Sequence, residues 1–239
     1  MKKVLLFLSL LAVFSSAIWS ATLQEAETHY REGHFASALT AYEDLLQTYP
    51  NDPYLYYNIG NCYFKMGSKG LATANYFRAF ALAPRDKDIR HNLSLALQKS
   101  GERLVPSGMP EVLHQAFFSL TGAELQGLLF IVIWLTCLGS AYWLLKRRGT
   151  WFVLTLWLIT ALIGTWYGWR SRLDKQPLAV VAAPVVELRS GPGNNFPASA
   201  NVAQGHIVIL QDSRDDWREV VVKSQGIKGW MPAQSLEQI

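Results

Sequence analysis

The pattern of hydrophobic and polar positions divides the chain into segments of different kinds. An apolar run at 4–14 follows two lysines at the extreme N-terminus. Aromatic and small residues then recur at fixed spacings up to about residue 100, and two long stretches without any charge follow. After Pro177, short runs rich in Val and Ile alternate with turn residues. The pattern predicts a multidomain membrane protein with an α-helical region, a two-helix transmembrane hairpin and a C-terminal all-β region.

The N-terminus has the layout of a secretory signal peptide. Lys2 and Lys3 form a basic segment ahead of the apolar run at 4–14, and Ser15-Ser16-Ala17 offers small residues for cleavage, with Ser20 as a second position. Residues 1–20 are therefore predicted to be a signal peptide. An uncleaved N-terminal anchor is the alternative, and either one sends the following segment across the membrane.

Two transmembrane helices are predicted at 127–145 and 151–169. Each stretch has nineteen residues and no charge, and at ~1.5 Å per residue each matches the hydrocarbon thickness of a bilayer. The loop at 146–150 carries three bases and no acid, which favours the cytoplasmic side. Bases also flank the far end of the second helix, so charge alone does not set the orientation of the hairpin. The predicted signal peptide sets it, because it sends the following segment across the membrane.

That orientation puts both soluble parts in the periplasm or outside the cell. The N-terminal soluble part covers 21–100, and the C-terminal one covers 178–239. Residues 101–126 and 170–177 are predicted to be linkers. The first of these either lays an apolar helical face on the membrane surface or is a plain linker helix.

Residues 53–84 carry a repeat signature. Tyr56-x-x-Ile59-Gly60-x-x-Tyr63 is followed by a second set that consists of Gly67, Ala72, Tyr76, Ala79 and Pro84. This pattern resembles the tetratricopeptide repeat (TPR), a pair of packed helices. A degenerate copy with Gly33, Ala38, Tyr42 and Pro50 lies thirty-four residues earlier, and 89–97 supplies a lone closing helix. We expect a TPR domain over 21–100 that is small, because repeat arrays need about three units.

The TPR resemblance assigns partner-binding candidates, because the first helix of each repeat lines the concave face in that family. The candidates are Tyr57, Asn61, Phe64, Lys65, Tyr30 and His91. Tyr57 and Phe64 are expected to point away from the helix–helix contacts. Glu27 and Leu95 contradict a clamp for C-terminal carboxylates, so that ligand is not predicted. The alternative is that all these side chains are solvated surface.

The C-terminal segment is predicted to be all β. Runs rich in Val and Ile at 178–188, 202–210 and 217–222 are separated by turns. The string VELRSGPG, then Asp-Asp-Trp-Arg-Glu-Val and finally Gly-Trp-Met, resembles the bacterial SH3 domain, although Glu187 stands where that family commonly has Asn. The resemblance implies an SH3-like barrel over 178–239. Its ligand candidates are Phe196, Trp217 and Trp230, with one or both tryptophans in the barrel core as the alternative.

Charge and motifs exclude several classes of function. The net charge is +4, and no soluble segment has the basic face that nucleic-acid binding needs. The sequence has no Walker loop, G-x-S-x-G or H-E-x-x-H motif, so neither an enzyme nor a cofactor is predicted. His29 and His34 would point to different faces of one helix, so no metal site is predicted. Cys62 and Cys137 are expected to be buried and functionally silent.

The order of the segments is more specific than any one of them. Together with YYNIGNCYFKMG at 56–67 and ALAPRDKDIRHNLSLAL at 81–97, it resembles the BatE family of the Bacteroides aerotolerance (Bat) group. That resemblance implies a non-enzymatic envelope protein that works beside von Willebrand A-type membrane proteins and a MoxR-type AAA ATPase. The leading hypothesis is a scaffold or assembly factor that docks protein partners at the bacterial inner membrane. The alternative is a peptidoglycan-binding module that recruits an envelope enzyme.

Overall fold

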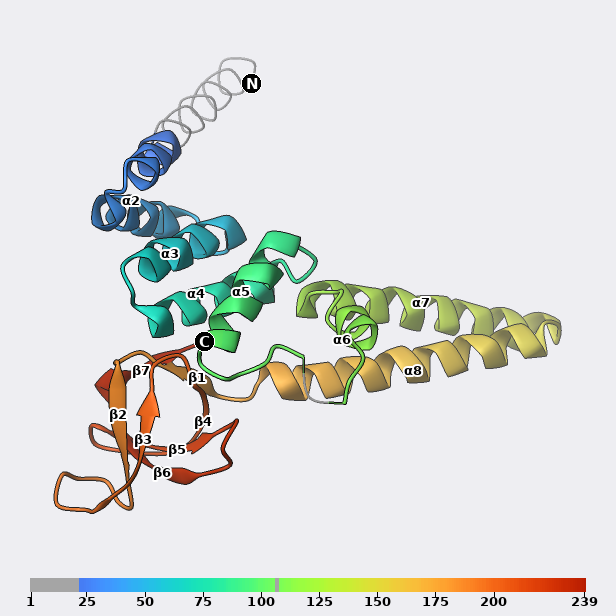
Figure 1. Cartoon of the computed structure of the whole chain (residues 1–239). Helices are drawn as coiled ribbons and strands as arrows, with labels where there is room; N and C mark the ends of the chain where they lie inside the picture. The colour runs from blue at the N-terminus through green and yellow to red at the C-terminus, as the bar shows by residue number, and fades with distance from the viewer. Residues whose placement is uncertain (1–21, 106–107) are drawn as a thin grey trace. The chain divides into compact units, whose positions relative to one another are not determined.

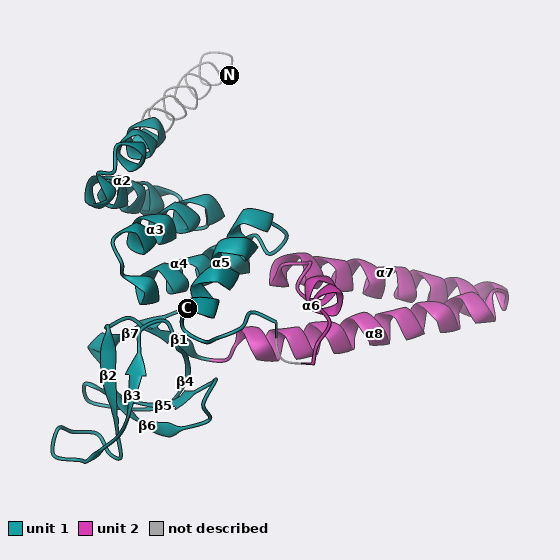
Figure 2. Cartoon of the chain, viewed as in Figure 1, with its two compact units in different colours: residues 1–107, 177–239 teal, residues 108–176 magenta. Residues whose placement is uncertain are grey.

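The computed structural model describes residues 22–105 and 108–239, and the chain forms two compact units (Figures 1 and 2). The first unit combines the residues up to 107 with 177–239, and the second comprises 108–176. The signal peptide predicted at 1–20 lies outside the described residues.

The N-terminal part of the first unit is a series of helices. Residues 22–31 are helical. The helices that follow are α2 (Phe35–Thr48), α3 (Pro53–Lys65), α4 (Lys69–Leu82) and α5 (Lys87–Lys99). Aspartates cap two of them: Asp52 accepts a hydrogen bond from the backbone of Tyr54, and Asp86 accepts two at the start of α5. Consecutive helices pack against one another from α2 to α5, and we call residues 22–105 the helical region.

Small residues set the closest approach between α3 and α4. A Cβ atom added at Gly60 would lie 2.7 Å from the ring of Tyr76, and Ala72 and Tyr76 are almost fully buried. On α5, Leu93 and Leu97 are both completely buried, as expected for a closing helix. The residues of the repeat signature therefore form the helix–helix contacts.

The C-terminal part of the first unit is a seven-stranded antiparallel sheet, called here the β region. Its strands are β1 (Leu178–Val181), β2 (Val185–Arg189), β3 (Ala198–Ala203), β4 (Ile207–Arg214), β5 (Trp217–Val222), β6 (Lys228–Pro232) and β7 (Leu236–Gln238). They run in the order β3-β2-β6-β5-β4-β1-β7, so β3 and β7 are free edges and the sheet is open. Alternate residues such as Leu188, Val202 and Val220 are fully buried in one core.

The strand predicted at 178–188 is two strands. Residues 182–184 separate β1 from β2, and these strands pair with different neighbours: β1 pairs with β4 and β7, whereas β2 pairs with β3 and β6. Pro184 explains the break, because proline has no N–H to donate within a ladder. Its carbonyl accepts a hydrogen bond from the N–H of Gln204 instead, at 3.0 Å.

The helical region and the β region pack against each other. Helix α4 contacts β1 and β7. A Cβ atom at Gly70 would lie 2.2 Å from the carbonyl oxygen of Val181, so α4 touches the backbone of β1 directly. Arg78 forms an ion pair with Glu237 and donates to the carbonyl of Gln238. Two chain segments separated by the whole second unit thus form one folded body.

Polar side chains at the end of α5 also join the helical region to the β region. Ser100 donates to the carbonyl oxygen of Gly205 at 3.1 Å. Oε1 of Glu102 lies 3.1 Å from Nδ1 of His206, and the two side chains are only 6% and 13% exposed. Because buried polar groups must find partners, these pairings also favour one register between the two regions.

The second unit contains the short helix α6 (Glu111–Phe117) and two long helices, α7 (Gly122–Lys146) and α8 (Thr150–Asp174). By length and composition, α7 and α8 could each cross a membrane. Both extend beyond the charge-free stretches. A capping box between Thr121 and Glu124 starts α7, and an Arg170–Asp174 ion pair at 2.8 Å lies in the last turn of α8.

Polar side chains join α7 to α8. The hydroxyls of Thr136 and Thr160 are 2.7 Å apart, and the indole N–H of Trp157 donates to Ser140. Hydrogen bonds of this kind between helices stabilise pairs within a membrane. Thr136 and Ser140 therefore lie at the contact between α7 and α8.

Candidate partner-binding surfaces

A hydrogen-bond network organises the predicted partner-binding face of α3. Nδ2 of Asn92 on α5 donates to the hydroxyl of Tyr57 and to Oδ1 of Asn61, at 3.0 Å each. The hydroxyl of Tyr76 on α4 donates to the same Oδ1 at 2.8 Å. The ring of Tyr57 also lies 6.0 Å from that of Tyr76, centre to centre. The expectation that Tyr57 points away from the helix contacts is therefore wrong.

Asn92 was not among the residues predicted from the sequence. The network holds three helices together, so Asn61 and Asn92 set the shape of the surface. Burial raises the pKa of Tyr76 above its usual value, and its hydroxyl stays protonated and remains a donor at any physiological pH. Only the accessible parts of half-buried Tyr57 and Asn61 are available to a partner.

The other predicted residues differ in their exposure. Lys65 and His91 are exposed, whereas Phe64 and Tyr30 are half-buried. Nζ of Lys99 lies 5.3 Å from the centre of the Phe64 ring, within the range of a cation–π contact. The ring of Tyr30 packs edge-on against Phe35 at the start of α2. Helix α3 thus presents a mixed face of aromatic, amide and basic groups.

Cys62 lies beneath this face and is fully buried. Burial, with a smaller contribution from Glu43, raises the pKa of its thiol to about 11. The thiol is therefore protonated at neutral pH, which makes it a poor nucleophile and a poor metal ligand. This environment agrees with a packing role for Cys62, whereas the expectation that Cys137 is buried is wrong, because that residue is exposed on α7.

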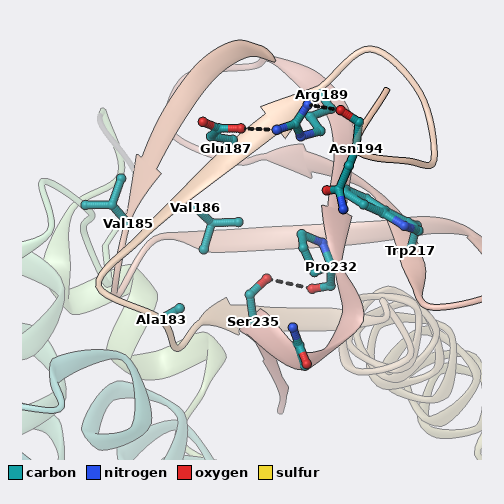
Figure 3. Close-up of a pocket in the computed structure, with 10 residues that line it drawn as sticks. Ala183, Val185, Val186, Glu187, Arg189, Asn194, Trp217, Pro232 and Ser235 are labelled. Carbon is teal, nitrogen blue, oxygen red and sulfur yellow. Dashed lines mark hydrogen bonds and ion pairs between the residues drawn. The ribbon is translucent and has the colours of Figure 1, made fainter. Parts of the chain in front are cut away.

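A groove of about 490 Å³ lies on the β region (Figure 3). Trp217 and Asn194 lie at one end of it and Ser235 at the other, and Glu187 and Arg189 extend from β2 along its side. Arg189 is fixed in place, because it pairs with Glu187 and donates to the carbonyl of Asn194 at 2.9 Å. The lining therefore combines one aromatic ring with charged and amide groups.

The three ligand candidates on the β region have different environments. Trp217 lines the groove, but Phe196 and Trp230 do not. Trp230 is only 6% exposed, and the guanidinium of Arg214 lies 5.5 Å from its ring centre. Phe196 covers Gly191, where a Cβ atom would lie 2.5 Å from the ring. Trp230 thus follows the alternative of a packed core residue, and the other two remain candidates.

The comparisons with known proteins concern the repeat. A 72-residue stretch of the chain, 30% of its length, is 31% identical to tetratricopeptide repeat protein 16 of Macaca fascicularis and to that of Homo sapiens. The match spans only 8% of the length of those proteins. No family model matches the chain. The chain is therefore similar to TPR proteins over about a third of its length, and this similarity suggests an interaction scaffold.

Proposed function

We propose that the protein is a non-enzymatic, membrane-anchored scaffold whose helical region binds protein partners. The observation that carries the proposal is the similarity to TPR proteins, whose repeats resemble the packed helices found here. Helical repeats of this kind bind other proteins through an extended concave surface. The mixed face of α3, with Tyr57, Phe64 and Lys65, suits a peptide or a helix of a partner better than a small molecule.

The contact between α4 and the β region supports a membrane topology for this scaffold. Segments on either side of α7 and α8 pack together, which requires them to be in one compartment. Two crossings satisfy that requirement. With three bases in the connecting loop, we assign the loop to the cytoplasm and both soluble regions to the periplasm or exterior of a bacterial inner membrane.

We also propose a module type for the β region and specific partners for the scaffold. We assign the β region to the SH3-like modules on the strength of its sequence motifs and antiparallel strands. The order of segments resembles the BatE family, so the partners we propose are von Willebrand A-type membrane proteins working with a MoxR-type AAA ATPase. The protein would hold these partners together at the membrane surface.

The test is affinity purification of crosslinked complexes from membranes. Replacing Phe64 and Lys65 by alanine should remove one or two anchors, each worth ~1–2 kcal/mol, and so weaken capture of partners by about tenfold or more. Gln47→Ala, at an exposed position on α2, is the matched control. Unchanged capture by the Phe64 and Lys65 variant would refute the use of this face.

Tyr57 needs a milder change because of its bond to Asn92. Tyr57→Phe removes the hydroxyl and keeps the ring, so loss of partners in this variant, with the fold intact by circular dichroism, would implicate the hydroxyl in binding. Tyr57→Ala should in addition loosen the contact between α3 and α4, because it removes the ring that lies against Tyr76.

The groove on the β region favours a second function, binding of peptidoglycan. Its aromatic ring, fixed arginine and amide are groups that commonly recognise sugars and short peptides. Trp217→Ala should then abolish sedimentation of the full chain with purified peptidoglycan. If this change also disperses the membrane complexes, while the α3 variants leave them intact, the wall-binding function takes precedence.

A further inference from the structure

We propose that His29, Glu32 and His34 form a zinc-binding site at the first turn of the helical region. One ligand atom from each of these side chains lies within 4.8 Å of the others. They were not predicted as a site, because on a continuous helix residues 29 and 34 would point to different faces. The structure overturns that reasoning, since the helix ends between them.

The local backbone explains why the two histidines meet. The helix over 22–31 ends in a Schellman turn, in which the N–H of His34 donates to the carbonyl of His29 at 2.9 Å and that of Gly33 donates to Tyr30. Gly33 has a φ of +83°, which the turn requires and glycine adopts at little cost. In this motif the residue after the glycine contacts the residue five positions earlier. Here that pair is His34 and His29, with ring centres 6.2 Å apart.

The donor set fits zinc. Zn²⁺ is bound in proteins by imidazole nitrogens and carboxylate oxygens in a tetrahedral arrangement. Nδ1 of His34 lies 3.4 Å from a carboxylate oxygen of Glu32, close to the separation of two ligands on one ion. Glu25, one turn before His29, has an oxygen 4.0 Å from Nε2 of that ring but lies outside the cluster, so a water would complete the four ligands. Small side-chain rotations would close this set around an ion.

A second observation concerns the His29 ring. Its Nδ1 is buried and has no hydrogen-bond partner among the described residues. The partly buried ring of His29 therefore keeps one nitrogen unsatisfied, although buried polar groups usually have a partner. Metal binding at this ring gives a reason for a histidine at a position where an apolar residue would pack equally well.

The second repeat provides an internal comparison. The same turn recurs after α3, where Ser68 donates to the carbonyl of Tyr63 at 2.9 Å and Gly67 has a φ of +83°. The residues that correspond to His29, Glu32 and His34 are Tyr63, Met66 and Ser68. The turn therefore folds without any ligand residue. The ligand set belongs to the first repeat alone, which argues that it is not demanded by the helical fold.

A bound ion would join the end of one helix to the start of the next. His29 belongs to the helix over 22–31, and His34 immediately precedes α2. A zinc ion would therefore fix the helix over 22–31 against α2, with which it already shares a core through Ala26 and Ala38. Zinc has no redox chemistry, and this site would be structural.

The test uses the full chain in detergent, without a histidine tag, and measures Zn²⁺ binding by competition with a chromogenic chelator. We expect one ion per chain, and Co²⁺ substitution should give the visible absorption of a tetrahedral site. The variant H29Y/H34S carries the residues of the second repeat at the same turn and should fold normally. It should bind at least about 100-fold more weakly.

His91→Ala is the matched control, because it removes an exposed histidine from α5. Zinc should raise the melting temperature of the wild type and of His91→Ala but not that of H29Y/H34S. Equal affinity in H29Y/H34S and the wild type would overturn the proposal, as would the absence of stoichiometric binding to the wild type. Loss of binding only in His91→Ala would move the site elsewhere and overturn it equally. None of these outcomes depends on partner capture.

Discussion

Replacing Gly60 by alanine should destabilise the helical region, although alanine is the better helix former. Gly60 lies in the middle of α3, and its Cα faces the ring of Tyr76 on α4. The new Cβ would lie 2.7 Å from two atoms of that ring and 3.3 Å from the carbonyl oxygen of Ala72. Tyr76 cannot simply move aside, because it is 2% exposed and its hydroxyl donates to Asn61.

The net effect is a balance of three contributions. Helix propensity favours alanine by ~1 kcal/mol. Overpacking at a buried contact costs ~1–3 kcal/mol. A shift of the ring also weakens the hydrogen bond from Tyr76 to Asn61, worth ~0.5–1.5 kcal/mol. The two costs exceed the gain over most of this range, so we expect the free energy of unfolding to fall by roughly 1–3 kcal/mol.

Hydrogen exchange followed by mass spectrometry on the full chain in detergent measures this effect locally. Peptides from α3 and α4 should lose protection in Gly60→Ala, while those from the β region change little. The double variant Gly60→Ala/Tyr76→Leu removes the ring that the methyl meets, so it should be more stable than the sum of the single changes predicts. Increased protection of α3 in Gly60→Ala, at the level of the propensity gain alone, would refute the close contact.

Three further predictions concern other parts of the molecule. A phosphatase active only outside the cytoplasm should be active when fused after Ile239 and inactive when inserted at Gly149; the opposite pattern would reverse the topology. Gly70→Ala should separate the helical and β regions in a protease-sensitivity assay while each stays folded, because its Cβ would strike the Val181 carbonyl; resistance equal to wild type would contradict the contact. Burial raises the pKa of the Cys62 thiol from 9.0 to about 11, so the stability that depends on the protonated thiol is present below pH 9 and is lost as the pH rises toward 11. The urea midpoint of the wild type should therefore fall over this pH range, and it should fall less in Cys62→Ala. An identical pH profile for the two proteins would count against burial of the thiol.

Local features of the fold were predictable from the sequence. The helices around Gly60 and Ala72 and the two long apolar helices follow from spacing and hydropathy, which act over a few residues. The expectation of a single strand at 178–188 was wrong. Pro184 is the residue in the sequence that could have indicated the break between β1 and β2. The contact between α4 and the β region was also missed. It joins Arg78 to Glu237, 159 residues apart, and no periodic pattern encodes such a pairing.

The candidate site was predictable only in part. Tyr57 and Asn61 were identified as candidates, but Tyr57 was expected to point away from the helix contacts. The bonds of Asn92 to both residues were missed, because they depend on how three helices pack. His29 and His34 were judged on helical geometry alone. The signal that was available is Gly33, since a glycine at the end of a helical pattern predicts a turn that brings its neighbours together.

The α7–α8 hairpin has a consequence for how the first unit is assembled. The N-terminal helices are synthesised first, and at ~5–20 residues per second Glu237 follows Arg78 by roughly 8–30 s. During that interval the side of α4 around Gly70 has no β1 to cover it. A flexible chain of this length would pay an entropic cost for closing the loop, about 0.6 kcal/mol for each doubling of its length. The hairpin shortens the effective loop, because Gly122 and Asp174 at its two ends lie close together. On the topology proposed above, insertion of the two apolar helices would act as a closure step, because it would return the chain to its starting side and bring the last strands close to α4.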